Sequence, residues 1–224
     1  MAESIIVTGA AGVLGRAVVA ELAQGGAKVI AVDVAKDIGG VGQAASVGGV
    51  DLTDAGATEA AYAGIVAEHG PLAGLANIAG GFRWEDVTGG SVDTWDLLYK
   101  MNVRTTLNSS KAALAGLAQG GGAIVNVGAA GAVRAAHGMG AYAASKAGVM
   151  RLTEALAEEY KDKGVRVNAV LPSIIDTPVN RADMPDAEFS RWVTPEALAG
   201  VIAFLLSDKA SAITGALIPV TGRV

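Results

Sequence analysis

Short apolar runs and longer helical patterns alternate along the chain. The apolar runs predict strands at residues 4–8, 28–32, 45–50, 72–77, 123–127, 165–171 and 216–220. Helical spacing between them predicts helices that end near residue 24 and that cover residues 54–68, 92–118 (with a break near Asn102), 141–163 and 195–207. Such alternation is typical of parallel strands joined by right-handed crossovers. The pattern therefore predicts an α/β fold, a doubly wound parallel sheet with helices on both faces.

Composition supports a large buried core in a single domain. Hydrophobic residues make up 51% of the 224 residues and charged residues 17%. The excess is mostly Ala, Val and Leu, which suits a sheet covered on both faces by Ala-rich helices. No Pro- or Ser-rich linker divides the sequence. We therefore expect one domain over residues 1–224.

Charge and targeting signals exclude several classes of function. The net charge is −5 and the basic residues are scattered, so we expect no nucleic-acid or anionic-membrane surface. The longest strongly apolar stretch, 197–206, is too short to span a bilayer, and the opening MAESIIVTG lacks the pattern of a signal peptide. The chain has no cysteine, and its two histidines, His69 and His137, lie far apart. We expect a cytoplasmic protein without a metal site.

Residues 8–15 read TGAAGVLG, directly after the first predicted strand and at the start of the first helix. Gly9 permits a tight turn, Gly12 allows the backbone to approach a pyrophosphate, and Gly15 allows close packing of helix and strand. The N–H groups of the first helical residues, Val13 and Leu14, would face that pyrophosphate. A spaced glycine triplet can arise by chance, and its position between strand and helix is what makes it informative. This context predicts a dinucleotide site and a Rossmann-type fold.

Asp33 lies about 20 residues beyond the glycine motif, at the end of the second predicted strand. A carboxylate there can accept both ribose hydroxyls of adenosine and would repel a 2′-phosphate, which favours NAD over NADP. A surface-turn aspartate is the other interpretation. Asp51 and Leu52 follow the third strand and could flank the adenine, although Asp51 could simply cap the next helix.

Residues 142–146 read Tyr-Ala-Ala-Ser-Lys. With the glycine-rich turn, this stretch resembles the short-chain dehydrogenase/reductase family, and the resemblance covers essentially the whole chain. The ordered set that carries it consists of the glycines at 9–15, Asp33, Asn77-x-Ala79-Gly80, Asn102, Tyr142 with Lys146, and Pro172 followed by Thr177.

The resemblance implies a catalytic pair on one helix face. Lys146 would hold the nicotinamide ribose. Together with the charge of the oxidised nicotinamide ring it would lower the Tyr142 pKa from its free value of about 10, so that Tyr142 could act as acid or base. Asn102 would help to hold a proton-relay water. The remaining cofactor contacts that the resemblance implies are Asn77, Ala79, Gly80, Pro172 and Thr177. An Ala-rich packing helix with surface polar residues is the other interpretation of Tyr142 and Lys146.

Two positions depart from the usual family pattern. Ala129 stands where most members have a serine that donates to the substrate oxygen, and Val13 stands where most place the middle glycine. Both departures resemble the quinonoid dihydropteridine reductase branch. The other similarities to that branch are Ala79-Gly-Gly-Phe82, Gly138-Met139 and the segment 176–192, whereas Asn77 and Asn102 match the ordinary branch. Segment 176–192 lies where the family keeps its substrate lid, which we place at about 176–194.

Several residues could contact the substrate. Phe82 could stack on a planar ring or only cover a loop. His137 could face the substrate or be solvated, and Arg181 could bind an acidic or pterin-like group. The position of the missing serine, Ala129, belongs to the same pocket.

The predicted reaction is hydride transfer from NADH to a small, planar substrate, with a Tyr/Lys acid–base pair and no catalytic serine. Pterin reduction is the sharpest form of this prediction. The alternatives are a reductase of another carbonyl, quinone or imine, an alcohol dehydrogenase of the same family, and a non-catalytic dinucleotide sensor. The family resemblance also implies a homodimer or homotetramer.

Overall fold

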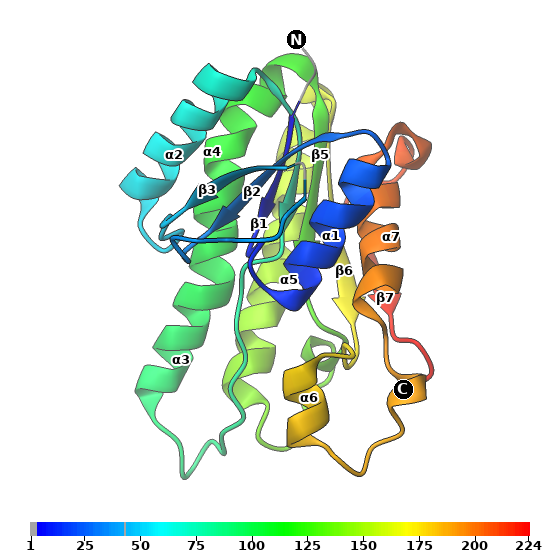
Figure 1. Cartoon of the computed structure of the whole chain (residues 1–224). Helices are drawn as coiled ribbons and strands as arrows, with labels where there is room; N and C mark the ends of the chain where they lie inside the picture. Colours follow the sequence, from blue (N-terminus) through cyan, green and yellow to red (C-terminus); the bar gives the residue numbers. More distant parts are fainter. Residues whose placement is uncertain (1–3, 43) are drawn as a thin grey trace.

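Seven parallel strands form one twisted sheet (Figure 1) in the computed structural model, which describes residues 4–42 and 44–224. The strand order is β3-β2-β1-β4-β5-β6-β7, so the chain reverses its direction of winding between β1 and β4. This order and the helices on both faces confirm the predicted single-domain Rossmann-type fold. The strands are β1 (Ser4–Thr8), β2 (Lys28–Asp33), β3 (Ala45–Gly48), β4 (Leu72–Asn77), β5 (Gly122–Val127), β6 (Val165–Pro172) and β7 (Leu217–Val220).

Helices cover both faces of the sheet. In Figure 1, α1 and α7 lie to its right, and α2 and α4 lie to its left. Helix α5 packs on the same face as α2 and α4. The helices are α1 (Val13–Gln24), α2 (Ala55–His69), α3 (Val92–Leu98), α4 (Thr105–Gly120), α5 (Gly140–Tyr160), α6 (Pro178–Asp183) and α7 (Pro195–Leu206).

The two cores follow from the two-residue period of the strands. In β1, Ile6 points into the core shared with α2, α4 and α5, and Val7 points into the core shared with α1 and α7. Ile124 and Val125 of β5 divide in the same way. Because both faces are buried, the strand sequences read as continuous apolar runs rather than as an alternation of apolar and polar residues.

The long helical pattern between residues 92 and 118 is interrupted, as predicted near Asn102. The chain forms a π-helical turn at Tyr99–Arg104, between α3 and α4. Wider turns of this kind occur inside helices and frequently at functional sites. The side chain of Asn102, at this turn, is fully buried and bonds to a neighbouring loop rather than facing water.

Some predicted boundaries were wrong. The third strand ends at Gly48 rather than residue 50, since Gly49 adopts a φ of +78° and turns the chain. The helix predicted to reach residue 163 ends at Tyr160 and is followed by a 3-10 turn, Lys161–Lys163. Helix α6 was not predicted at all. It spans only six residues, and Thr177 caps it by accepting a hydrogen bond from the Asn180 N–H.

Within the described residues, no helix has the length and apolar character needed to cross a membrane. The same part of the chain holds no cluster of three or more His, Cys, Asp or Glu side chains that could bind a metal ion. Residues 1–3 lie outside the described residues. The expectation of no signal peptide rests partly on them.

Candidate functional site

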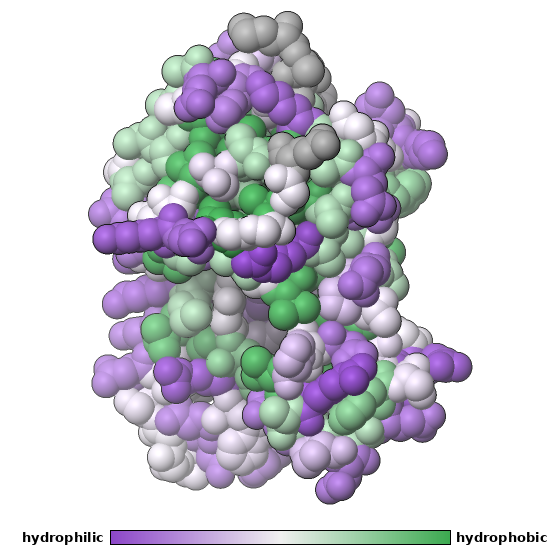
Figure 2. All heavy atoms as spheres, viewed as in Figure 1, coloured by the Kyte–Doolittle hydropathy of each residue, from purple (hydrophilic) through white to green (hydrophobic). Residues whose placement is uncertain are grey.

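A cleft of about 880 Å³ opens at the carboxyl ends of β1 and β4, where the strand order reverses. Figure 2 shows the molecule hollowed below its middle on the face seen in Figure 1. Ligands of doubly wound sheets bind at this switch point because the loops after the two strands part there. The cleft has a cofactor end, built around the turn after β1, and a substrate end, beneath the loop after β4 and the segment after β6.

The glycines of the first turn are required by close backbone contacts. Gly9 has a φ of +63°, and a Cβ placed on it would lie 2.8 Å from the Cα of Ala79. A Cβ on Gly15 would lie 2.1 Å from the carbonyl oxygen of Gly9. Helix α1 then begins at Gly12 without a side-chain cap. The free N–H groups of Val13 and Leu14 therefore open onto the cleft, which fits the pyrophosphate of a dinucleotide.

Asp33 ends β2 at the rim of the cofactor end. Its Oδ2 accepts a hydrogen bond from the Ala11 N–H and its Oδ1 accepts one from the Ala35 N–H, each at 2.9 Å. These two bonds fix the carboxylate beside the glycine turn, where only 9% of the residue is exposed. Each oxygen keeps a second lone pair, so the carboxylate can still accept ribose hydroxyls.

Arg16 holds the loop that follows Asp33. Its guanidinium donates to the carbonyl oxygens of Ala11, Ile38 and Gly39 at 2.6–2.9 Å. These donors are occupied by backbone, so Arg16 braces the adenosine side of the cleft rather than offering a free cation there.

Tyr142 and Lys146 project from α5 into the cleft, four residues apart on one face of the helix. The Lys146 ammonium donates to the carbonyl oxygen of Val127 at 2.8 Å. Burial lowers the pKa of Lys146 to about 8 and raises the pKa of Tyr142 to about 12. In the protein alone the Tyr142 pKa therefore lies above its free value, opposite to the direction expected with the oxidised cofactor bound. A Cβ on Gly80 would lie 3.3 Å from the Lys146 nitrogen, so the glycine leaves the ammonium open to the cleft.

Asn102 ties α5 to the loop after β4. Its Oδ1 accepts from the Gly81 N–H at 2.9 Å, and its Nδ2 donates to the Gly81 carbonyl and to the Ser145 hydroxyl. Ser145 in turn donates to the carbonyl oxygen of Tyr142 at 2.8 Å. The side chain of Asn102 therefore positions the residues around Tyr142.

A buried polar chain lies beneath the cleft. Asn77, at the end of β4, donates to Asn126 on β5 and to Ser110 on α4. Asn126 donates onward to Thr153 of α5. These bonds fix the ends of β4 and β5 relative to α4 and α5. Asn77 therefore positions these elements and does not itself line the cleft.

The loop after β4, residues 81–90, runs over Tyr142, and we call it the strap. The Phe82 ring meets the Tyr142 ring edge to face, with centroids 4.9 Å apart. Trp84 donates to the carbonyl oxygen of His137, and its indole occupies the space where Gly138 lacks a side chain. His137 Nε2 lies 2.9 Å from Asp86 Oδ1. The strap is thus fastened to the loop that leads into α5.

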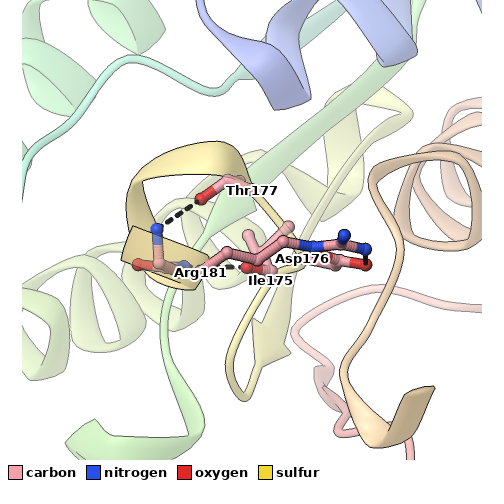
Figure 3. A network of polar contacts seen from close by, with 5 residues as sticks. Ile175, Asp176, Thr177 and Arg181 are labelled. Carbon is pink, nitrogen blue, oxygen red and sulfur yellow. Dashed lines mark hydrogen bonds and ion pairs between the residues drawn. The ribbon is translucent and has the colours of Figure 1, made fainter. Parts of the chain in front are cut away.

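The lid begins after β6 and contains α6. Arg181 forms a bidentate pair with Asp176, at 2.6 and 2.7 Å, and Figure 3 shows this pair next to the cap formed by Thr177. The same guanidinium lies over the Phe189 ring, 4.8 Å from its centroid. The hydrogen bond from Arg181 holds the pKa of Asp176 below its usual range. The charge of Arg181 is therefore already paired within the lid.

Most of the predicted site residues come together in the cleft. The predicted residues that line it are Gly9, Gly12, Val13, Leu14, Gly15, Asp33, Asp51, Leu52, Ala79, Gly80, Phe82, Tyr142, Lys146 and Thr177. Those that do not line it are Asn77, Asn102, Ala129, His137, Pro172 and Arg181. Their contacts with a ligand remain predictions. Asn77 and Asn102 act beneath the surface, and Pro172 is buried at the end of β6.

Sequence reasoning missed some of the cleft wall. Met101, Ile175, Val179 and Asn180 line the substrate end. An apolar side chain carries no chemical signature, so nothing in the sequence distinguishes Val179 of α6 from a packing residue. Met101 adjoins Asn102 in the π-helical turn, and that change in helical period was its one available signal.

Comparison with known proteins identifies the family. Residues 9–222 match the sequence family described as enoyl-(acyl carrier protein) reductase. The chain belongs to the short-chain dehydrogenase/reductase family. Its relatives are dehydrogenases and reductases, so the chain is an NAD(P)-dependent oxidoreductase of this family.

Three relatives and one solved structure illustrate the match. The chain is 38% identical to "Inactive 2-(S)-hydroxypropyl-CoM dehydrogenase 2" of Xanthobacter autotrophicus, over 88% of this chain and 94% of that protein. It is 36% identical to cis-4-hydroxycyclohexanecarboxylate dehydrogenase of Sinomonas cyclohexanicum, over 97% and 94%. It is 34% identical to cyclohexanol dehydrogenase of Acinetobacter sp., over 97% and 92%. The ligand-free aldohexose dehydrogenase of Thermoplasma acidophilum superposes with a TM-score of 0.90 at 27% identity, covering 99% and 93% of the two chains.

Proposed function

We propose that this chain reduces a small, planar substrate with NADH, using Tyr142 as the proton donor and no catalytic serine. The observation that carries the proposal is the pair formed by Tyr142 and Lys146, which project together into the cleft beside the glycine turn. Bound nicotinamide would supply the hydride. The residues of this chain would bind the dinucleotide, orient the substrate and deliver the proton.

Each member of the pair has a distinct task. Burial keeps Tyr142 protonated at neutral pH, since its pKa is raised to about 12, and a protonated phenol is the form that a reduction consumes. Lys146, whose pKa is lowered to about 8, is mostly charged at neutral pH. A charged Lys146 stabilises the phenolate that remains after Tyr142 has given up its proton, and it can donate to the nicotinamide ribose.

We propose NADH rather than NADPH as the cofactor. The fixed carboxylate of Asp33 would accept ribose hydroxyls and repel a 2′-phosphate. Arg16, the cation nearest to the glycine motif in sequence, directs three of its five N–H donors to backbone carbonyls, which holds it on the loop after Asp33.

Reduction of a quinonoid dihydropterin is the sharpest form of the proposal. Such a ring takes up hydride and a proton in a conjugated system, so a donor at position 129 is dispensable. Ala129 is 4% exposed and contributes no polar side-chain atom. A reductase of another carbonyl, quinone or imine, or an alcohol dehydrogenase, is the alternative, and the two relatives named for ring alcohols favour it. A dinucleotide sensor without catalysis would have no use for Tyr142.

Assembly into a homodimer or homotetramer is part of the proposal. Trp95, Leu97 and Tyr99 are exposed along α3 and the π-helical turn. Large apolar side chains gathered on one segment favour coverage by another subunit. The molar mass in solution, measured by light scattering, tests this part.

The experiment that tests the reaction is NADH consumption with freshly generated quinonoid dihydropterin, beside quinones, ketones and aldehydes, for the native enzyme and for Tyr142→Phe. We expect a loss of roughly 10²- to 10⁴-fold in turnover, because a positioned general acid contributes about that much. NADH affinity should change little. Tyr160→Phe, at the far end of α5, is the matched control. Unchanged turnover in Tyr142→Phe would refute the mechanism, and turnover of other compounds without pterin turnover would refute only the pterin substrate.

A further inference from the structure

The substrate end of the cleft is apolar. Phe82, Met101, Ile175 and Val179 line it, and the polar side chains of the lid that reach it, Thr177 and Asn180, are neutral. Among the cleft-lining residues that the structure describes, Lys146 is the sole cation. It is committed to the catalytic pair, so the substrate end offers no charge of its own to an anionic group.

Arg181 is the cation of the lid. It follows cleft-lining residues in the sequence but does not line the cleft itself. Val179 and Asn180 line the cleft, whereas the next residue, Arg181, does not. Figure 3 shows the Arg181 side chain extended toward Asp176, with the guanidinium beside the carboxylate. The Phe189 ring supports the same guanidinium from another side. A bidentate pair stacked on an aromatic ring fixes the direction of an arginine more firmly than a single contact does.

The histidine of the preceding loop also lies next to a carboxylate. His137 lies against Asp86 of the strap, and its ring packs edge to face on Trp84 at 5.4 Å between centroids. His137 does not line the cleft. The two side chains that the sequence predicts to meet an acidic substrate, Arg181 and His137, therefore each lie against a carboxylate of this chain.

The cost of binding depends on the charge of the substrate. An anion that enters an apolar cleft loses its hydration and gains no partner in exchange, which is unfavourable. An uncharged ring loses little hydration and gains apolar contact. Phe82 already meets Tyr142 by one edge and remains 53% exposed, so it can provide a surface for a second ring beside the proton donor.

We propose that the cleft selects an uncharged ring as substrate, and that Asp176 is a specificity-determining residue that keeps the charge of Arg181 away from it. This inference rests on the proposed function and deepens it, because it names the substrate class of the same site. Neutral pterins, quinones and cyclic ketones or alcohols belong to this class. A ring that carries a carboxylate, sulfonate or phosphate does not.

The first test uses two alcohols that differ by one carboxylate. Cyclohexanol and cis-4-hydroxycyclohexanecarboxylate are offered with NAD⁺, and kcat/KM is measured for both. Calorimetry on the enzyme–NAD⁺ complex measures their binding in parallel. We expect the neutral alcohol to be preferred by at least about tenfold, since a single uncompensated charge in an apolar site costs that much or more. Equal or better use of the carboxylate overturns the inference, as does a complex that binds neither ring.

The second test releases the charge of Arg181. Asp176→Asn keeps the shape of the side chain but removes the carboxylate. We expect the preference for the neutral alcohol to shrink by about threefold, because the partly solvated charge of the released Arg181 would attract the carboxylate of the other alcohol. Asp183→Asn, at the exposed end of α6, removes the same charge without touching Arg181 and should leave the preference unchanged. Equal effects of the two substitutions would overturn the role of Asp176.

The third test examines the Phe82 ring as a stacking surface for the substrate. Phe82→Ala should raise KM for the neutral ring severalfold with a smaller change in kcat, and Phe82→Tyr should restore most of the loss. An unchanged KM in Phe82→Ala contradicts the ring platform. Failure of the proposed function looks different, because Tyr142→Phe would then retain full turnover whichever ring is preferred.

Discussion

The two ends of the cleft are built in different ways. The cofactor end is made largely of backbone, from one continuous turn that carries Gly9, Gly12 and Gly15, with Asp33 fastened to it by N–H groups. The substrate end is made of side chains from four distant segments, the strap, the π-helical turn, the start of α5 and the lid. A backbone site tolerates little change because every residue type but glycine collides. A side-chain site can change its preference by one substitution, and so the two ends should respond very differently to mutation.

Gly15→Ala should have the largest effect on cofactor binding, because it places a Cβ 2.1 Å from the Gly9 carbonyl oxygen. Neither backbone segment can move without opening the turn that holds the pyrophosphate. We expect NADH affinity to fall by roughly 30- to 150-fold, as judged by fluorescence titration, if a single hydrogen-bonded anchor of about 2–3 kcal/mol is lost. Urea unfolding on the same protein separates lost binding from lost folding.

The control for this substitution lies in α2. Gly64→Ala meets no atom within 4 Å, and it should keep NADH binding intact. Because alanine favours helix interiors over glycine, we expect its free energy of unfolding to rise by up to about 1 kcal/mol. If Gly15→Ala bound NADH as tightly as Gly64→Ala, the cofactor end would not be the rigid backbone site described above.

Asp33→Ala should change which cofactor is preferred. Loss of the carboxylate removes the acceptor for the ribose hydroxyls and the repulsion of a 2′-phosphate, so the ratio of kcat/KM for NADH to that for NADPH should fall by roughly 10- to 100-fold. Asp37→Ala, in the exposed part of the same loop, should leave the ratio unchanged. A ratio that does not move in Asp33→Ala would place the specificity elsewhere.

The pH dependence of the reaction joins the two ends, since the proposed mechanism uses Lys146 at both. Its charged form exists below a pKa of about 8, whereas Tyr142, with a pKa near 12, keeps its proton through the accessible range. In the reductive direction, kcat/KM for NADH should be level near neutral pH and fall by up to tenfold per unit above about 8. In the oxidative direction Tyr142 must first lose its proton, so the rate should rise with pH. A reductive profile that is level to pH 10 would exclude Lys146 as the controlling group.

The same contrast explains what could be foreseen from the sequence. Strands buried on both faces give long apolar runs, and the glycine turn has a fixed spacing, so the fold and the cofactor end follow from local patterns. Most of the residues predicted to contact the cofactor do line the cleft. Tyr142 and Lys146 were foreseeable for the same reason, since four residues of helix place them side by side.

The substrate end could not be foreseen to the same degree. Nothing in the sequence places Asp176 opposite Arg181 rather than opposite a substrate, because the direction of a long side chain is decided by packing against residues such as Phe189. The fastening of Trp84 over Gly138 joins residues 54 positions apart, and it depends on a glycine with a φ of +71°. The side-chain bonds of Asn102 to Gly81 and Ser145 could not be foreseen either, and its contact with a relay water stays a prediction.

Ala129→Ser should have the smallest effect. It tests whether the substrate end lacks a hydrogen-bond donor that the reaction requires, or whether the reaction needs no donor at position 129. Position 129 is extended and buried at the end of the loop after β5, so a serine fits its backbone conformation. A required hydrogen-bond donor that an active site lacks is worth about 10²- to 10³-fold in turnover. If the natural substrate is a conjugated ring that accepts its proton from Tyr142 alone, the added hydroxyl should change kcat by less than about threefold. Ala130→Ser, one residue further along, controls for the polarity of the loop. A gain of tenfold or more in Ala129→Ser alone would mean that the substrate has an oxygen that receives no hydrogen bond from position 129 in the native protein. Such a result would favour a simple ketone over a pterin or quinone.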